Sequence, residues 1–255
     1  MDRFSGVTAA ALAAVTDGLV ADLGSVIAAP PVTHTYNPLI YARNGYDRYV
    51  ARFGNTVKAV VLLGMNPGPY GMAQTGVPFG DVQMVNGWMG INADVGQPVN
   101  PHPKRPIAGF CCRRAEVSGR RLWGWAKSRF GTAPTFFDRF FVLNYCPLLF
   151  MERGGRNRTP DKLAPAEKKW LFHACDQALR QSVAILQPRW VVGVGGFAAQ
   201  RAAEALRDMG VSIGRITHPS PANPKANRGW QALIESELTR LGIDLPGTKS
   251  QGLME

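Results

Sequence analysis

The feature that most constrains the fold is an alternation of short apolar, β-branched runs with longer helical patterns. Such an alternation predicts a mostly parallel sheet with helices on both faces. The four runs predicted as strands are bounded by Gly or Pro: Val57–Leu63, Arg139–Asn144, Trp190–Val194 and Val211–Thr217. The helical patterns cover residues 38–53, 116–130, 164–186, 197–209 and 227–241.

The chain of 255 residues is 45% hydrophobic, which suits one domain with a substantial core. No Pro/Ser-rich linker interrupts it, so residues 1–255 are predicted to form a single domain. Apolar residues near the start recur at helical spacing and predict an amphipathic helix over about residues 4–28. The tail 246–255 is expected to be mobile, and no apolar run approaches the length of a membrane span.

Basic residues are in excess and concentrated. Lys and Arg number 29 against 18 acidic residues, a net charge of +11, which favours a polyanionic partner such as nucleic acid. Between Val95 and Phe130 there are eight basic residues and one acid, and residues 153–162 carry four more basic side chains. A solvated surface is the alternative, but this density favours a phosphate-binding face.

Four cysteines occur without a C-x-x-C pair, so zinc and iron–sulfur sites lack a ligand framework and no metal is expected. Apolar surroundings at Cys146 and Cys175 indicate reduced core residues and an intracellular protein. We expect it in the cytoplasm, with the nucleoid, if the source is bacterial, and in the nucleus if it is eukaryotic.

Three unusual segments follow the predicted strands, at the edge where parallel sheets bind ligands. They are a Gly- and Pro-rich loop at Gly64–Gly71, Asn144, and the stiff segment His218–Pro224. Asn66 offers an amide that can hold a water, and His218 is a donor held rigidly over the same crevice. A structural turn and a capped-turn histidine are the plain alternatives; the other three histidines lack such a setting.

One further pattern, G-x-G-x-x-A at Gly193–Ala198, resembles half of a dinucleotide fingerprint. The acidic residue expected about twenty positions later is missing, and Arg215 stands in that neighbourhood. We therefore expect no dinucleotide cofactor, and we interpret the glycines as allowing close packing of a helix on a strand.

Two long segments carry a specific resemblance. Gly64–Gly80 (GMNPGPYGMAQTGVPFG) and His218–Trp230 (HPSPANPKANRGW) closely resemble the signature segments of the single-strand-selective monofunctional uracil-DNA glycosylases. Shorter stretches between them, including Glu116–Gly119 and Asn144–Phe150, are also similar, so the resemblance covers roughly Asn37 to Leu241. It implies a three-layer α/β/α fold around a central, mostly parallel, four-stranded sheet.

The resemblance also implies a chemistry. These enzymes extrude a uracil nucleotide and hydrolyse the bond between base and deoxyribose. His218 matches the histidine that donates to uracil O2 as negative charge accumulates there, and Asn66 matches the residue that positions the attacking water. No cofactor, metal or covalent intermediate is implied, and Asp81, the nearest acid in sequence, receives no role.

Base recognition is implied by the same match. Phe79 corresponds to the aromatic residue that stacks on the flipped base, and Asn144 to the residue that hydrogen-bonds its Watson–Crick edge. Gly68 corresponds to a position where the family keeps space beside C5, which implies tolerance of 5-hydroxymethyluracil. Gly64 and Met65 complete the expected base-binding set.

The loop after His218 resembles the family wedge that fills the gap left by the flipped nucleotide. This sequence departs from the common pattern, because Ala222 occupies a position where a bulky basic residue is usual. We therefore expect weak holding of duplex product and a preference for single strands, with Lys225 and Arg228 contacting phosphates. The expected DNA-binding residues are Pro219, Ser220, Pro221, Ala222, Asn223, Lys225 and Arg228.

The sequence therefore predicts a monomeric, monofunctional glycosylase that acts on uracil in single- and double-stranded DNA and releases free uracil, leaving an abasic site. One alternative is a sibling glycosylase for mismatched thymine or deaminated purines. Another is a DNA-binding protein that keeps the fold without the chemistry.

Overall fold

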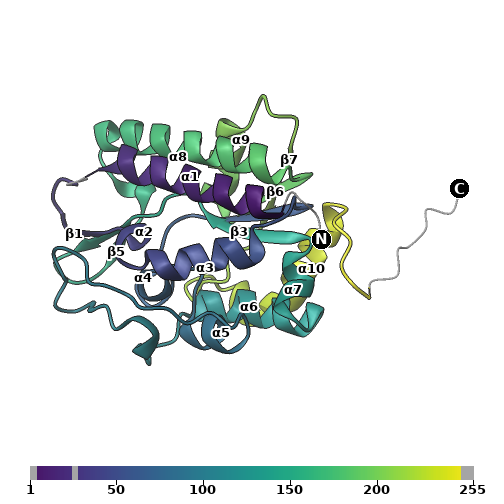
Figure 1. The fold of residues 1–255 in the computed structure, drawn as a ribbon, viewed down its shortest axis with the longest axis horizontal. Helices are drawn as coiled ribbons and strands as arrows, with labels where there is room; N and C mark the ends of the chain where they lie inside the picture. Colours follow the sequence, from purple (N-terminus) through teal and green to yellow (C-terminus); the bar gives the residue numbers. More distant parts are fainter. Residues whose placement is uncertain (1–4, 25–27, 248–255) are drawn as a thin grey trace, which may run out of the picture.

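A parallel four-stranded sheet lies at the centre of the computed structural model, which describes residues 5–24 and 28–247 (Figure 1). The strand order is β3-β2-β6-β7, and every neighbouring pair is parallel. The strands are β2 (Val60–Gly64), β3 (Phe140–Asn144), β6 (Trp190–Val194) and β7 (Ser212–Ile216). The predicted sheet is confirmed, with strand bounds that differ by up to three residues.

The central strand β2 shows why a continuous apolar run in the sequence predicted a strand. All five of its residues are buried, as expected for a strand covered on both faces. In its register with β3, Gly64 lies opposite Asn144. The loops that follow β2 and β3, which carry expected site residues, therefore begin next to each other.

Helices form a layer on each side of the sheet, giving the three-layer α/β/α arrangement (Figure 1). One layer contains α1 (Ser5–Leu23), α8 (Pro165–Leu186) and α9 (Gly196–Ala205). The other contains α5 (Val82–Gly87), α6 (Val117–Phe130), α7 (Ala133–Phe137) and α10 (Trp230–Arg240). Fully buried aromatic side chains fill the core on this second side: Trp123, Trp125, Phe136 and Phe140.

The predicted helix 38–53 is two helices, α2 (Pro38–Tyr41) and α3 (Arg43–Phe53), interrupted at Ala42. Tyr49 of α3 covers the open edge of β3: its Oη donates to Val142 O (3.0 Å) and accepts from Val142 N (3.2 Å). The hydroxyl thus satisfies backbone groups that an edge strand would leave unpaired.

A second sheet, absent from the sequence prediction, holds one side of the site. It is antiparallel, with order β1-β4-β5, and consists of β1 (Val32–Tyr36), β4 (Leu149–Glu152) and β5 (Asn157–Arg158). Leu148–Met151 is an apolar run, and Gly154-Gly155 follows as a hairpin turn, so a local signal existed. The short remaining elements are α4 (Met72–Thr75), η1 (Gly109–Cys111), η2 (Pro160–Lys162) and η3 (Ala226–Arg228).

Several predicted boundaries were wrong. The first helix ends at Leu23 rather than near residue 28, because Gly24 turns the chain with φ +44°. The last helix starts at Trp230 rather than 227, after Gly229 with φ +116°. Residues 1–4 and 248–255 lie outside the described part of the chain, and with them most of the tail expected to be mobile.

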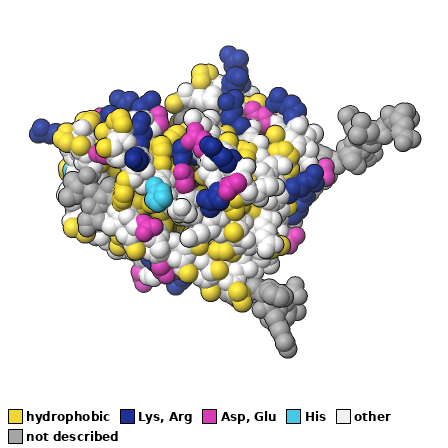
Figure 2. Space-filling view, turned by 90° about the horizontal axis from the view of Figure 1, so that it is seen from above, with side chains coloured by type: hydrophobic (Ala, Val, Ile, Leu, Met, Phe, Trp, Pro, Cys, Tyr) yellow, Lys and Arg dark blue, Asp and Glu magenta, His cyan; other side chains and the backbone are white. Residues whose placement is uncertain are grey.

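The surface over α1 and α8 mixes charges of both signs with apolar side chains, rather than forming one basic field (Figure 2). Val7 of α1 is exposed, so the predicted apolar face of that helix is only partly buried. Among residues 5–24 and 28–247 no helix is long and apolar enough to cross a membrane.

Candidate active site

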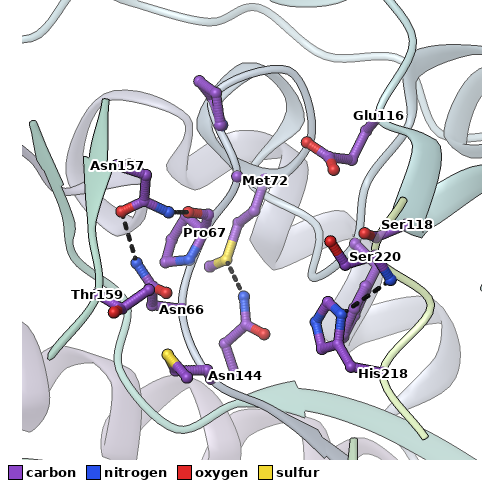
Figure 3. A pocket seen from close by; sticks show the side chains of 14 residues that line it. Asn66, Pro67, Met72, Glu116, Ser118, Asn144, Asn157, Thr159, His218 and Ser220 are labelled. Carbon is purple, nitrogen blue, oxygen red and sulfur yellow. Dashed lines mark hydrogen bonds between the residues drawn. The ribbon is translucent and has the colours of Figure 1, made fainter. Parts of the chain in front are cut away.

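A cavity of about 380 Å³ opens at the carboxyl ends of the central strands (Figure 3). This size is typical of small-ligand pockets. It brings together the three sequence segments expected to converge there, joined by residues of α6 and the small sheet. The lining residues are Met65, Asn66, Pro67, Gly68, Pro69, Met72, Phe79, Glu116, Ser118, Asn144, Asn157, Thr159, His218 and Ser220.

Asn144 lies at the floor of the pocket, where β3 ends (Figure 3). Its Nδ2 donates to Met72 Sδ at 3.2 Å, which leaves Oδ1 and the second amide proton available to a ligand. Gly64 makes room for this arrangement, because a Cβ there would lie 2.3 Å from Asn144 Oδ1 and 2.7 Å from the Phe79 ring. Gly64 therefore shapes the pocket without lining it.

His218 follows β7 and has a defined tautomer. Its Nδ1 accepts a hydrogen bond from the backbone N–H of Ser220 at 3.0 Å, so in the neutral ring the proton resides on Nε2. Burial lowers the pKa of His218 to about 4. At neutral pH the residue is thus an uncharged donor, in a ring that lines the pocket (Figure 3).

Phe79 is held in a left-handed backbone conformation, with φ +53°, which non-glycine residues rarely adopt. Its carbonyl accepts from Trp123 Nε1 (3.0 Å) and Asp81 N (2.8 Å). Gly119 lets α6 approach, since a Cβ there would meet Phe79 O at 2.0 Å. The packing thus imposes the unusual conformation, and the Phe79 ring lies 6.1 Å from that of His218.

Asn66 lies across the pocket from His218, beside Asn157 and Thr159 (Figure 3). Its Nδ2 donates to Leu148 O at 3.3 Å and to Asn157 Oδ1 at 3.4 Å. Asn66 and His218 are therefore on opposite walls of the cavity, with Asn144 between them.

Glu116 is a pocket residue to which sequence reasoning assigned no role. It precedes α6, and its carboxylate fills the space beside Gly68, where a Cβ would lie 2.4 Å from Oε2. Burial raises its pKa, and the charge of Asp81 acts in the same direction, while the N–H groups of Tyr70 and Ser118 lower it. The only signal in the sequence was its place in a stretch similar to the family.

Asp81 has a structural role. It is 1% exposed, and its Oδ2 accepts from Glu116 N (3.0 Å) and Arg120 Nε (3.1 Å). This carboxylate fixes the start of α6 against the loop that carries Phe79.

The loop after His218 is ordered by its own hydrogen bonds and by α6. Arg121 donates to Pro219 O and to Asn227 Oδ1, both at 2.9 Å, and Asn227 Nδ2 donates to Pro221 O at 2.9 Å. Of the residues expected to bind DNA, Ser220 lines the pocket. Those outside its lining are Pro219, Pro221, Ala222, Asn223, Lys225 and Arg228.

Several side chains of the basic stretch before residue 130 contact other groups of the protein. Arg120 is ion-paired with Asp81, although its side chain is still 44% exposed, and Arg121 donates to Pro219 O. Arg105 and Arg114 lie over the ring of Tyr70, at 5.6 and 4.4 Å from its centroid, near the Gly- and Pro-rich loop.

The glycines of the G-x-G-x-x-A pattern pack closely, as interpreted from the sequence. A Cβ at Gly193 would meet Ala199 N at 2.1 Å, and Gly195, with φ +96°, lies under the side chain of His218. Within the described residues, no three His, Cys, Asp or Glu side chains gather as a metal site requires.

Comparison with known proteins agrees with this geometry. Residues 51–236 match the uracil DNA glycosylase superfamily. The chain is 44% identical to the rat single-strand selective monofunctional uracil-DNA glycosylase over 236 residues, covering 92% of this chain and 84% of that protein. It is 46% identical to the bovine protein of the same name over 210 residues, covering 82% and 77%.

The crystal structure of wild-type SMUG2 from Pedobacter heparinus has the same fold, with a TM-score of 0.62 at 16% identity. It covers 89% of this chain and 97% of that one. Fold and site together define an α/β/α protein with a base-sized pocket at the carboxyl edge of its sheet. The chain belongs to the uracil DNA glycosylase superfamily.

Proposed function

We propose that this chain hydrolyses the N-glycosidic bond of uracil in DNA, releasing free uracil and leaving an abasic site. The observation that carries the proposal is His218, whose Nδ1 accepts from Ser220 N–H so that Nε2–H is the donor of a ring lining the pocket. The target base must leave the helix to reach such a cavity.

Stabilisation of the departing base is the main task of the site. As the bond between C1′ and N1 breaks, its electron pair leaves with uracil, and negative charge spreads to O2. His218 Nε2–H donates to O2, and it is already oriented before charge develops. A neutral imidazole donates without transferring its proton, so uracil departs as an anion.

Asn66 positions the nucleophile. Both of its amide protons have acceptors in Leu148 O and Asn157 Oδ1, so Oδ1 is free to accept a hydrogen bond from water. That water attacks C1′ as the base departs and loses a proton to solvent. An amide is too weak a base to generate hydroxide, so positioning is its contribution.

Asn144 reads the base edge and Phe79 stacks on its face. Asn144 Oδ1 accepts a hydrogen bond from uracil N3–H. One amide proton of Asn144 is bound to Met72 Sδ, and the other donates to uracil O4. Cytosine presents the opposite pattern and is refused. The pocket-lining residues include no lysine, so a Schiff-base lyase step has no amine at the site.

Binding to both single- and double-stranded DNA is part of the proposal. Arg105 and Arg114 at Tyr70 would contact phosphates near the pocket, and Lys225 and Arg228 are exposed on the wedge. Ala222 is exposed at the wedge turn and is too small to fill a base stack. We also propose that the protein acts as a monomer inside the cell, with cytoplasm or nucleus set by its source.

The test uses matched single-stranded and duplex oligonucleotides carrying one uracil, treated with the protein in chelator and then with hot alkali. Strand breaks that require alkali, and are lost in His218→Ala, would support the proposal. Parallel oligonucleotides carry a mismatched thymine or a deaminated purine, and breaks only in these would assign the chain to the sibling glycosylases instead. Salt-sensitive DNA binding with no excision of any base would indicate a binding protein.

A further inference from the structure

Strand β5 of the small sheet places Asn157 against Asn66 (Figure 3). Asn157 Nδ2 donates to Pro67 O at 3.4 Å, and its Oδ1 accepts from Asn66 Nδ2 at 3.4 Å. Pro67 O can only accept, so it determines which end of the Asn157 amide faces Asn66.

The orientation of Asn66 follows from that of Asn157. An amide nitrogen has two protons, and those of Asn66 go to Leu148 O and Asn157 Oδ1. A flipped Asn66 would turn its own oxygen toward these two acceptors, leaving Asn157 Oδ1 without this donor and Leu148 O with only the weak thiol donor of Cys146 at 3.9 Å. The two acceptors together thus keep Asn66 Oδ1 as the free end of the amide.

We propose that Asn157 is a positioning residue, which holds the Asn66 amide with its oxygen available to the attacking water. Asn157 acts through Asn66 and not on the base. Its substitution should therefore change the rate of bond hydrolysis and not the affinity for DNA. The inference rests on the proposed role of Asn66 in hydrolysis.

The primary test is the single-turnover excision rate of Asn157→Ala on a uracil-containing single strand at saturating protein. We expect a fall of about 10- to 100-fold, the usual range for a misplaced catalytic group. The Kd for the oligonucleotide and the inhibition constant of free uracil should stay within about twofold of wild type, because Asn157 is not proposed to contact the base.

Two comparison variants distinguish a loss of Asn66 orientation from a general destabilisation of the small sheet. Asn157→Asp keeps an oxygen acceptor for Asn66 Nδ2, but it loses the proton donated to Pro67 O and adds a charge at the pocket, so its rate should lie between those of Asn157→Ala and wild type. Thr33→Val removes a hydrogen bond elsewhere in the small sheet, from Thr33 Oγ1 to Met151 O at 3.3 Å, and should leave the rate unchanged. A fall in Thr33→Val equal to that of Asn157→Ala would overturn the proposal.

A double-mutant cycle decides whether Asn157 acts through Asn66. In an Asn66→Ala background, Asn157→Ala should slow excision by less than about twofold, because there is no amide left to orient. Equal slowing in both backgrounds, or a wild-type rate for Asn157→Ala alone, would refute the inference. An unaffected rate in Asn66→Ala would instead remove the proposed role of Asn66.

Discussion

The neutral state of His218 makes a sharp prediction for the pH dependence of excision. With a pKa of about 4, imidazolium is on the order of 0.1% of the protein at pH 7. If the neutral ring is the working donor, the single-turnover rate should be flat from pH 8 to about 5.5 and fall with a midpoint near pH 4. If imidazolium were required, the rate would instead rise about tenfold for each pH unit between 7 and 5.

The magnitude of the His218 contribution follows from its place in the site. Loss of one oriented donor to a developing oxyanion typically costs 10²- to 10³-fold in rate, so His218→Ala should slow excision by about that factor. Glu116 is the other pocket group with a shifted pKa, and it is the necessary control. In Glu116→Gln the acid limb should keep its midpoint.

Stability must be followed in the same pH series. A depressed histidine pKa contributes stability that is present above pH 6.5 and lost as the pH falls through about 4, amounting to roughly 3 kcal/mol. Circular dichroism at each pH will show whether the protein is folded where the rate falls. A rate that falls with a midpoint near 6.5 in folded protein would refute the assignment of a neutral donor.

Three further variants test the pocket and the wedge. Gly68→Tyr must displace the Glu116 carboxylate and should reduce excision of 5-hydroxymethyluracil more than that of uracil; equal loss on both would contradict this. Ala222→Arg should slow release of duplex abasic product by adding a phosphate contact, measured as burst amplitude against steady-state rate, and product affinity equal to wild type would count against it. Arg121→Ala frees the wedge loop and should weaken duplex excision more than single-strand excision, whereas equal effects would indicate general unfolding of α6.

The central sheet could be predicted because β2, β3 and β6 are nearly continuous apolar runs and β7 is followed closely by Pro219. Strand β5 could not be predicted from periodicity, because two residues cannot show one. Asn157 was therefore given no role, although it lies within Gly155–Pro160, a stretch that also resembles the family. Its contact with Asn66 depends on pairing between β4 and β5, which only the folded register determines.

The charged residues also have partners that the sequence could not predict. The count of basic residues could not show that Arg120 pairs with Asp81 or that Arg121 donates to Pro219 O, because both partners are distant in sequence. By contrast, the donor role of His218 was within reach of the sequence, because the group that fixes its tautomer is only two residues away. Local geometry could be inferred from the motif, whereas long-range partners could not.

In the proposed mechanism, the polar groups assigned to the base and the water share one property, which explains how the site would work without a strong base. Asn66, Asn144 and His218 are neutral dipoles fixed by partners of the protein itself, so they need no reorganisation when charge develops on uracil. An ionised carboxylate beside the departing anion would oppose the reaction, and burial favours the protonated form of Glu116. The proposed mechanism thus has neutral groups at the departing base, and burial raises the pKa of Glu116, the acid of the pocket lining that would repel the anion.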